Sequence, residues 1–213
     1  MLPLLLSIAC CCVVSKTDSL VAYGDSKSEL REGAGLNQGL FAQILLSQAR
    51  LFPDCPNVRF DLVTPTGTGY LARGNHTLHQ MAGYIAADLA EITGTPTAVL
   101  FSMGTVELPS LPAEATWKAD ALAVLDAMRA RWPAVRVYMV KPWRRGYSAE
   151  SDTLAGWIDA VITLRPSFVF AGHDERVWLE HGDDGVAYTS DGIHYSNKGS
   201  AECARQWRTI LGF

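Results

Sequence analysis

The chain alternates short apolar runs, rich in β-branched residues, with longer segments in which apolar residues recur every three or four positions. Runs of the first kind are typical of buried strands, and segments of the second kind are typical of amphipathic helices. Strands are expected at residues 19–23, 58–64, 97–103, 135–140 and 167–171. Most of these runs show no polar alternation, which indicates strands that are covered by helices on both faces.

The segments between the runs predict helices that each bear one apolar stripe. The stripes are Leu36, Leu40, Phe41, Ile44 and Leu45; Leu78, Met81, Ala82, Ile85, Leu89 and Ile92; Trp117, Ala121, Val124, Leu125 and Met128; and the segments 154–164 and 197–211. The second helix begins with a capping box, Thr77-Leu78-His79-Gln80. Strands and helices in this order predict an α/β fold with three layers, αβα, in which the middle layer is a flavodoxin-like, five-stranded parallel sheet.

The length of 213 residues fits a single domain, which we place at residues 18–213. Residues 1–17 before it are largely apolar and include Cys10, Cys11 and Cys12. The apolar stretch is too short for a membrane span, which needs about 20 residues. Two interpretations stay open: an export signal or lipid anchor, which would make the protein secreted or periplasmic, and a tail packed on the domain or an artefact of the gene start.

The net charge of −4 gives no electrostatic footprint for nucleic acid. The cysteine count leaves the redox compartment open, because five is an odd number and Cys55 and Cys203 can pair only if the fold brings them together. The oligomeric state does not follow from the sequence.

Three glycine-bearing turns each follow a predicted strand, so they are expected at one edge of the parallel sheet. Ligands of such folds bind at this edge, beyond the carboxyl ends of the strands. These turns are Gly24-Asp25-Ser26, Gly67-Thr68-Gly69 and Gly104-Thr105-Val106. Near the C-terminus, Asp191 precedes His194 by three residues with Gly192 between them. Such an acid can fold back to accept the Nδ1 proton of the histidine, which leaves Nε2 to take a proton from a serine. The sequence therefore predicts an acyl-transfer site in which Ser26 is the nucleophile, while Asp25 stabilises the turn.

Together these segments resemble the SGNH hydrolases, also called the GDSL esterase/lipase family, from about residue 20 to the C-terminus. The resemblance implies that Ser26 is the nucleophile and an oxyanion donor, that Gly69 is a second donor, and that Asp191 and His194 complete a triad. Gly199 matches the glycine of the last block. The family also implies an αβα fold, hydrolysis of carboxylic esters or thioesters, and no metal or other cofactor.

One block departs from the family pattern. The third block usually ends Gly-x-Asn-Asp, with the Asn side chain donating to the oxyanion, but here the chain reads Gly104-Thr105-Val106-Glu107. Val106 has no side-chain donor, and loss of one such donor costs about 10²–10³ in rate in a protease. Asn75 or Thr105 is a candidate replacement; the alternative for Asn75 is an ordinary loop residue.

Trp143, Arg144 and Arg145 follow the fourth predicted strand and are candidates for recognition of a sugar or an acidic substrate. The alternative is a solvated loop with Trp143 packed beneath it. We expect a serine esterase of short-chain esters, with O-acetylated carbohydrate as the substrate class by family analogy. The competing interpretations are a non-catalytic carbohydrate-binding module on the same fold, and a thioesterase or lysophospholipase.

Overall fold

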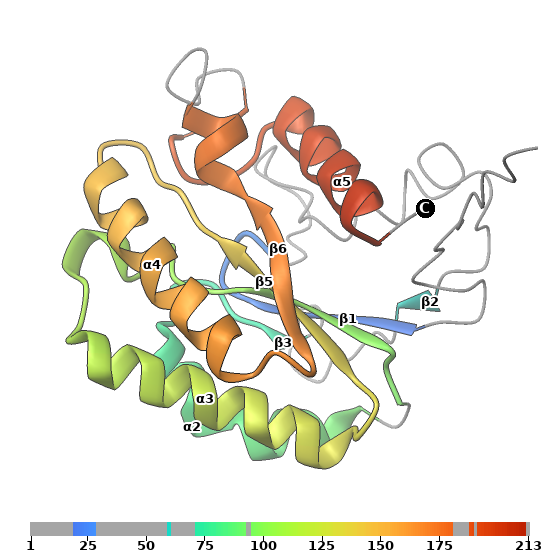
Figure 1. The fold of residues 1–213 in the computed structure, drawn as a ribbon. Coiled ribbons are helices and arrows are strands. Elements are labelled where there is room, and N and C mark those ends of the chain that lie inside the picture. The colour runs from blue at the N-terminus through green and yellow to red at the C-terminus, as the bar shows by residue number, and fades with distance from the viewer. Residues whose placement is uncertain are drawn as a thin grey trace, which may run out of the picture.

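The structure is a computed structural model that describes residues 19–28, 59–60, 71–92, 95–180, 188–189 and 191–211 (Figure 1). In these ranges all strands of the sheet are parallel, in the order β2-β1-β4-β5-β6, and β3 also pairs with β1. The strands are β1 (Ser19–Gly24), β2 (Arg59–Phe60), β3 (Leu71–Ala72), β4 (Ala98–Ser102), β5 (Arg136–Lys141) and β6 (Val169–Asp174).

The two short strands β2 and β3 share one edge position. β2 pairs with the start of β1, at Ser19 and Leu20, and β3 pairs with its end, at Tyr23 and Gly24, while β4 occupies the opposite side of β1. The sheet therefore has the five positions and the strand order of the predicted flavodoxin-like fold. Residues 61–64 of the second predicted strand lie outside the described residues, and β3 was not predicted.

Helices cover both faces of the sheet. The helices are α2 (Leu78–Glu91), α3 (Glu114–Arg131), α4 (Ser148–Leu164), α5 (Asn197–Leu211) and the short turns η1 (Leu108–Ser110) and η2 (Arg176–Glu180). Figure 1 shows α2, α3 and α4 on one face and α5 on the other. The predicted capping box is present: the Thr77 side chain accepts from the Gln80 N–H, and the Gln80 side chain accepts from the Thr77 N–H. The helix predicted around residues 36–45, like residues 1–17, lies outside the described residues.

Two apolar clusters fill the spaces between the layers. Val21 and Tyr23 of β1 face the cluster under α2, α3 and α4, whereas Ala22 faces the cluster under α5. This alternation explains why the strand sequences show no polar side. Trp117 and Trp207 are buried in these clusters. Cys203 is a free thiol buried in the second cluster, and Cys55 lies outside the described residues.

Most boundaries lie within two residues of the predicted ones, and two differ by more. α4 begins at Ser148 and not at the predicted residue 154. The prediction misses its first turns because they are polar and carry no apolar stripe. β6 runs to Asp174 and does not end at the predicted residue 171. The prediction stops early because Gly172, His173 and Asp174 do not resemble a buried strand. In the described part of the chain, no helix is both long and apolar enough to cross a bilayer.

Candidate active site

The turn after β1 is packed too closely to accept a side chain at its first position. A Cβ atom on Gly24 would lie 2.3 Å from the Ser28 Oγ and 2.7 Å from the carbonyl oxygen of Ser102 on β4. Such distances are shorter than atoms tolerate, so glycine is required at this strand end. The chain turns directly after Gly24, and Ser26 follows two residues later at a half-buried position.

Asp25 holds this turn in place from within the core. Its carboxylate is fully buried and accepts two hydrogen bonds, from the N–H of Lys27 and from the N–H of Thr105, each at 3.1 Å. Burial raises the pKa of Asp25 above its ordinary value, although the neighbouring Lys27 acts to lower it. Asp25 thereby ties the loop after β1 to the loop after β4, which agrees with its predicted turn-stabilising role.

The segment from Asp191 to His194 folds back on itself. Gly192 has a φ of 86°, a left-handed conformation that glycine adopts without strain. Asp191 Oδ1 accepts from the N–H of Ile193 (2.9 Å) and from that of His194 (2.7 Å), and Oδ2 lies 2.6 Å from His194 Nδ1. Partial burial alone would raise the pKa of Asp191, but the hydrogen bonds from His194 and Ile193 outweigh it and hold the pKa below its ordinary value.

The other imidazole nitrogen of His194 reaches the turn after β1. His194 Nε2 lies 2.9 Å from Ser26 Oγ, although 168 positions separate the two residues in the chain. The structure thus places Asp191, His194 and Ser26 in one continuous line of hydrogen bonds, which we call the relay. With Nδ1–H donated to Asp191, Nε2 is the nitrogen that can accept the serine proton.

The candidates for the oxyanion hole are placed unequally. Gly69 lies outside the described residues. Thr105 adjoins the Asp25-Ser26 turn through its own N–H, and its buried Oγ1 has no hydrogen-bond partner among the described residues. Val106 follows it, half-buried. Asn75 is exposed and has a φ of 60°, a conformation that Asn tolerates better than most residues, so the turn itself gives a reason for Asn at this position.

The loop after β5 supports the histidine segment rather than presenting an aromatic ring to solvent. Trp143 is fully buried in the cluster under α5, so it corresponds to the packed alternative and not to a recognition residue. The N–H of Arg145 donates to the carbonyl oxygen of Gly192 (3.0 Å), and its guanidinium donates to Thr189 (3.3 Å). Arg144 is half-buried, with its guanidinium 5.2 Å from the centre of the Tyr147 ring.

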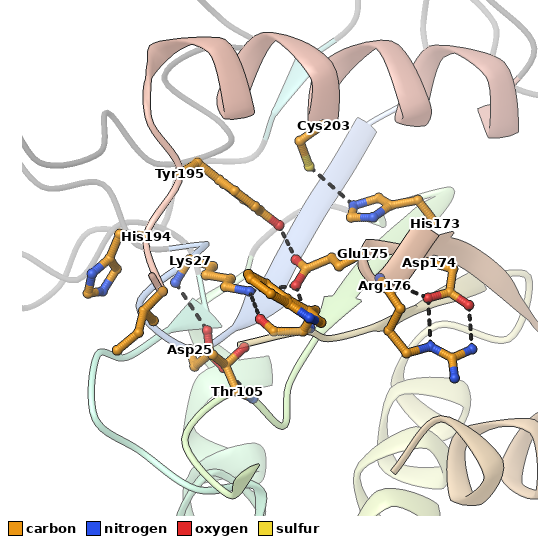
Figure 2. A network of polar contacts seen from close by, with 12 residues as sticks. Asp25, Lys27, Thr105, His173, Asp174, Glu175, Arg176, His194, Tyr195 and Cys203 are labelled. Atoms are coloured by element: carbon orange, nitrogen blue, oxygen red, sulfur yellow. Dashed lines mark hydrogen bonds and ion pairs between the residues drawn. The ribbon is translucent and has the colours of Figure 1, made fainter. Parts of the chain in front are cut away.

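Sequence reasoning missed a buried polar group that adjoins the relay. The carboxylate of Glu175 accepts from Lys27 Nζ at 2.5 Å and from the Tyr195 hydroxyl, and none of these side chains is more than marginally exposed. Figure 2 shows the side chains of Lys27 and Tyr195 both reaching the Glu175 carboxylate. Two signals could have found the group: a lysine directly after the serine, and an acid at the carboxyl end of the last strand.

Two described histidines outside the relay make other contacts. His79 Nδ1 lies 3.0 Å from Asp120 on the surface, and His173 Nε2 lies 3.2 Å from Cys203 Sγ in the core. Burial lowers the pKa of His173 to about 4, so this side chain is neutral at physiological pH. Within the described ranges, no three His, Cys, Asp or Glu side chains group together as a metal site requires.

No protein-family model matches the sequence, and neither does any curated protein. Solved structures do match the fold. A family 3 carbohydrate esterase from Clostridium thermocellum is 19% identical with a TM-score of 0.66, covering 91% of this chain and 96% of that one. An acetyl-xylooligosaccharide esterase from Geobacillus is 14% identical with a TM-score of 0.69, covering 94% and 96%.

A GDSL-like lipase from Bacteroides thetaiotaomicron is 12% identical with a TM-score of 0.60, and the match covers 92% of this chain and 88% of that one. At such identities a match speaks for the fold. The strand order, the helices on both faces and these neighbours agree with the fold that the sequence motifs predict. The chain therefore has the three-layer αβα fold of the SGNH, or GDSL, hydrolases.

Proposed function

We propose that the protein is a serine esterase that hydrolyses short-chain carboxylic esters. The observation that carries the proposal is the relay: Asp191 Oδ2 lies 2.6 Å from His194 Nδ1, and His194 Nε2 lies 2.9 Å from Ser26 Oγ. A nucleophile within hydrogen-bond reach of a base, with the base oriented by a third group, is the arrangement that acyl transfer needs.

Each residue of the relay has one task in this reaction. Ser26 Oγ attacks the ester carbonyl carbon as its proton passes to His194 Nε2, and the negatively charged Asp191 stabilises the resulting imidazolium. The N–H groups of Ser26 and Gly69 hold the oxyanion of the tetrahedral intermediate, and Thr105 is our candidate for a further donor. The intermediate then expels the alcohol, which takes the proton from His194. A water molecule hydrolyses the acyl-enzyme by the same steps in reverse.

Acetyl groups on carbohydrate are the proposed substrate class. The support is at the level of the fold: two of the neighbouring structures are a family 3 carbohydrate esterase and an acetyl-xylooligosaccharide esterase. p-Nitrophenyl esters of increasing acyl length test this proposal, with the highest kcat/KM expected for acetate. A maximum at long acyl groups would instead favour a thioesterase or a lysophospholipase.

Comparison of the wild type with Ser26→Ala tests the reaction itself. Hydrolysis of p-nitrophenyl acetate should fall by about 10⁴-fold or more in Ser26→Ala, because loss of the nucleophile removes the covalent pathway. Ser110→Ala, which changes an exposed serine on η1, is the matched control and should keep the wild-type rate. Equal rates for wild type and Ser26→Ala would show that Ser26 is not the nucleophile.

Val106 favours a second candidate function, a carbohydrate-binding module without turnover, because no amide donor stands at this position of the third block. That candidate predicts glycan binding that is unchanged by Ser26→Ala. It also predicts no reaction of Ser26 with a fluorophosphonate probe. Stoichiometric labelling of Ser26 would exclude it.

A further inference from the structure

The two carboxylate oxygens of Glu175 contact three chain segments beside the relay: the turn after β1, the loop after β5 and the segment that follows His194. Glu175 follows β6 directly and is fully buried. Oε2 accepts from Lys27 Nζ (2.5 Å) and from the N–H of Trp143 (2.8 Å), and Oε1 accepts from the Tyr195 hydroxyl. Lys27 Nζ also donates to the carbonyl oxygen of Trp143 at 2.7 Å. We call this set of contacts the Glu175 hub.

The hub grips the chain immediately beside both reacting side chains of the relay. Lys27 is the residue after Ser26, and Tyr195 is the residue after His194. In each pair one side chain enters the relay and the next enters the hub. Figure 2 shows the Tyr195 side chain directed to Glu175 and the His194 ring directed away from it. Glu175 therefore connects the two halves of the Ser26–His194 contact through a single carboxylate.

The hub is suited to fix a geometry because it is buried and its polar groups are paired. Lys27 and Glu175 are 1% and 0% exposed, so water does not compete for their hydrogen bonds. The Lys27 ammonium also lies 5.4 Å from the centre of the Tyr195 ring, which adds a cation–π contact between the two segments. A displacement of either segment would separate a buried charge from its partner, and this cost resists motion.

We infer that Glu175 is a positioning residue for ester hydrolysis, acting through Lys27 and Tyr195 to hold Ser26 Oγ and His194 Nε2 in contact. The inference rests on the proposed function. Glu175 touches no reacting atom, so weakening the hub should leave substrate binding and KM largely unchanged. The attack step should slow by about 10- to 100-fold, because a displacement of about 1 Å between reacting groups has an effect of this size.

Tyr195→Phe tests the inference with the smallest change, since it removes one hydrogen bond of the hub and keeps the ring. The matched control is Tyr138→Phe, which removes the hydroxyl of another tyrosine in the same apolar cluster. The measured quantities are kcat and KM for p-nitrophenyl acetate, and the second-order rate constant for labelling of Ser26 by a fluorophosphonate. The kcat values are calculated per site that the probe labels, so that partial unfolding lowers the number of active sites and not kcat.

The expected result is a 10- to 100-fold fall in kcat and in the labelling rate constant for Tyr195→Phe, with KM within about threefold of wild type and Tyr138→Phe unchanged. The double variant Lys27→Met/Glu175→Gln removes both charges together and so avoids an unpaired buried ion; it should show a similar fall. Rate constants within twofold of wild type in both hub variants would overturn the positioning role. A wild type that neither hydrolyses the ester nor labels at Ser26 would overturn the proposed function and this inference with it.

Discussion

The relay and the Glu175 hub lie side by side and differ most in their exposure to solvent. In the relay, the side chains of His194 and Asp191 are 22% and 39% exposed, whereas in the hub those of Lys27 and Glu175 are 1% and 0% exposed. In the proposed reaction the relay must meet the substrate and water, so it cannot be sealed. In that proposal the chemistry takes place at the exposed groups, and their buried neighbours fix their geometry.

The two acids also carry their charge in different ways. Asp191 is held ionised by hydrogen bonds from the chain segment that it belongs to, whereas Glu175 lies against the ammonium of Lys27, 148 positions away in the chain. Changes at Asp191 should therefore act on the reaction with little effect on folding. Changes in the hub should act on both.

Asp191→Asn should produce the largest effect and act on the reaction alone. Asparagine keeps the shape but cannot stabilise the imidazolium, and it favours the wrong tautomer of His194. In a serine protease the equivalent change lowers kcat about 10⁴-fold, and we expect about 10³–10⁴-fold here. The measurement is kcat for p-nitrophenyl acetate beside the free energy of unfolding in urea, which should change by less than about 1 kcal/mol because the position is partly exposed.

Asp159→Asn is the matched control, since Asp159 is an exposed acid on α4 that pairs with Lys141. It should retain wild-type kcat. A fall of less than tenfold for Asp191→Asn would contradict the orienting role of Asp191. A large loss of stability in the same variant would remove the distinction between relay and hub.

Lys27→Met should lower stability as well as kcat, because it leaves the Glu175 carboxylate buried without its cation. Removal of one partner from a buried ion pair costs about 3–5 kcal/mol. Adding Glu175→Gln removes the remaining charge and should recover at least about 2 kcal/mol of the loss. Urea unfolding of the wild type, both single variants and the double variant gives the coupling energy of the pair.

Lys141→Met provides the comparison for a pair in which the lysine is partly buried and the acid is exposed. Lys141 Nζ lies 2.8 Å from Asp159, but the carboxylate side chain is 57% exposed, so its loss should cost less than about 1 kcal/mol. If Lys27→Met cost no more than Lys141→Met, burial would not distinguish the two pairs. The hub would then lack the stiffness that its positioning role requires.

The fold and the relay could be predicted from the sequence because their signals are local. Apolar runs and helical stripes reflect burial of each segment by itself, and Asp191 lies three residues from His194, so their contact depends on one turn. The wrong boundaries fall where the pattern is polar, at the start of α4 and at the end of β6. The contact of His194 with Ser26 needed the additional rule that carboxyl ends of parallel strands meet at one edge.

The hub could not be predicted in the same way because each of its contacts joins distant segments. A lysine in a turn is normally solvated, and its contacts with Glu175 and with the carbonyl oxygen of Trp143 make its burial tolerable. The predicted end of this strand, residue 171, also lies before Glu175, so the prediction does not put this acid at the carboxyl end of a strand. Trp143 shows the converse limit: its neighbours Arg144 and Arg145 suggested an exposed recognition loop, but its ring fills the core.

Glu107 is a buried carboxylate whose hydrogen bonds include none from a cation. Oε1 accepts from the N–H of Leu78 at the start of α2, and Oε2 has no hydrogen-bond partner among the described residues. Burial, with a smaller contribution from the charge of Asp25, raises the pKa of Glu107 from 4.5 to about 7. The folded protein therefore binds a proton between these values that the unfolded chain has released.

This proton makes the stability of the wild type fall as pH rises from about 4.5 to about 7, and the shift corresponds to a limit of about 3 kcal/mol. Glu107→Gln is neutral at every pH and keeps an acceptor for Leu78. Its free energy of unfolding relative to wild type should thus rise by about 1–3 kcal/mol between pH 5 and pH 8, measured in urea. Glu114→Gln, at an exposed position on α3, should show a change below about 0.5 kcal/mol. A pH-independent difference for Glu107→Gln would mean that Glu107 stays ionised in the folded protein over this pH range. Burial without a cation partner would then not be enough to raise its pKa.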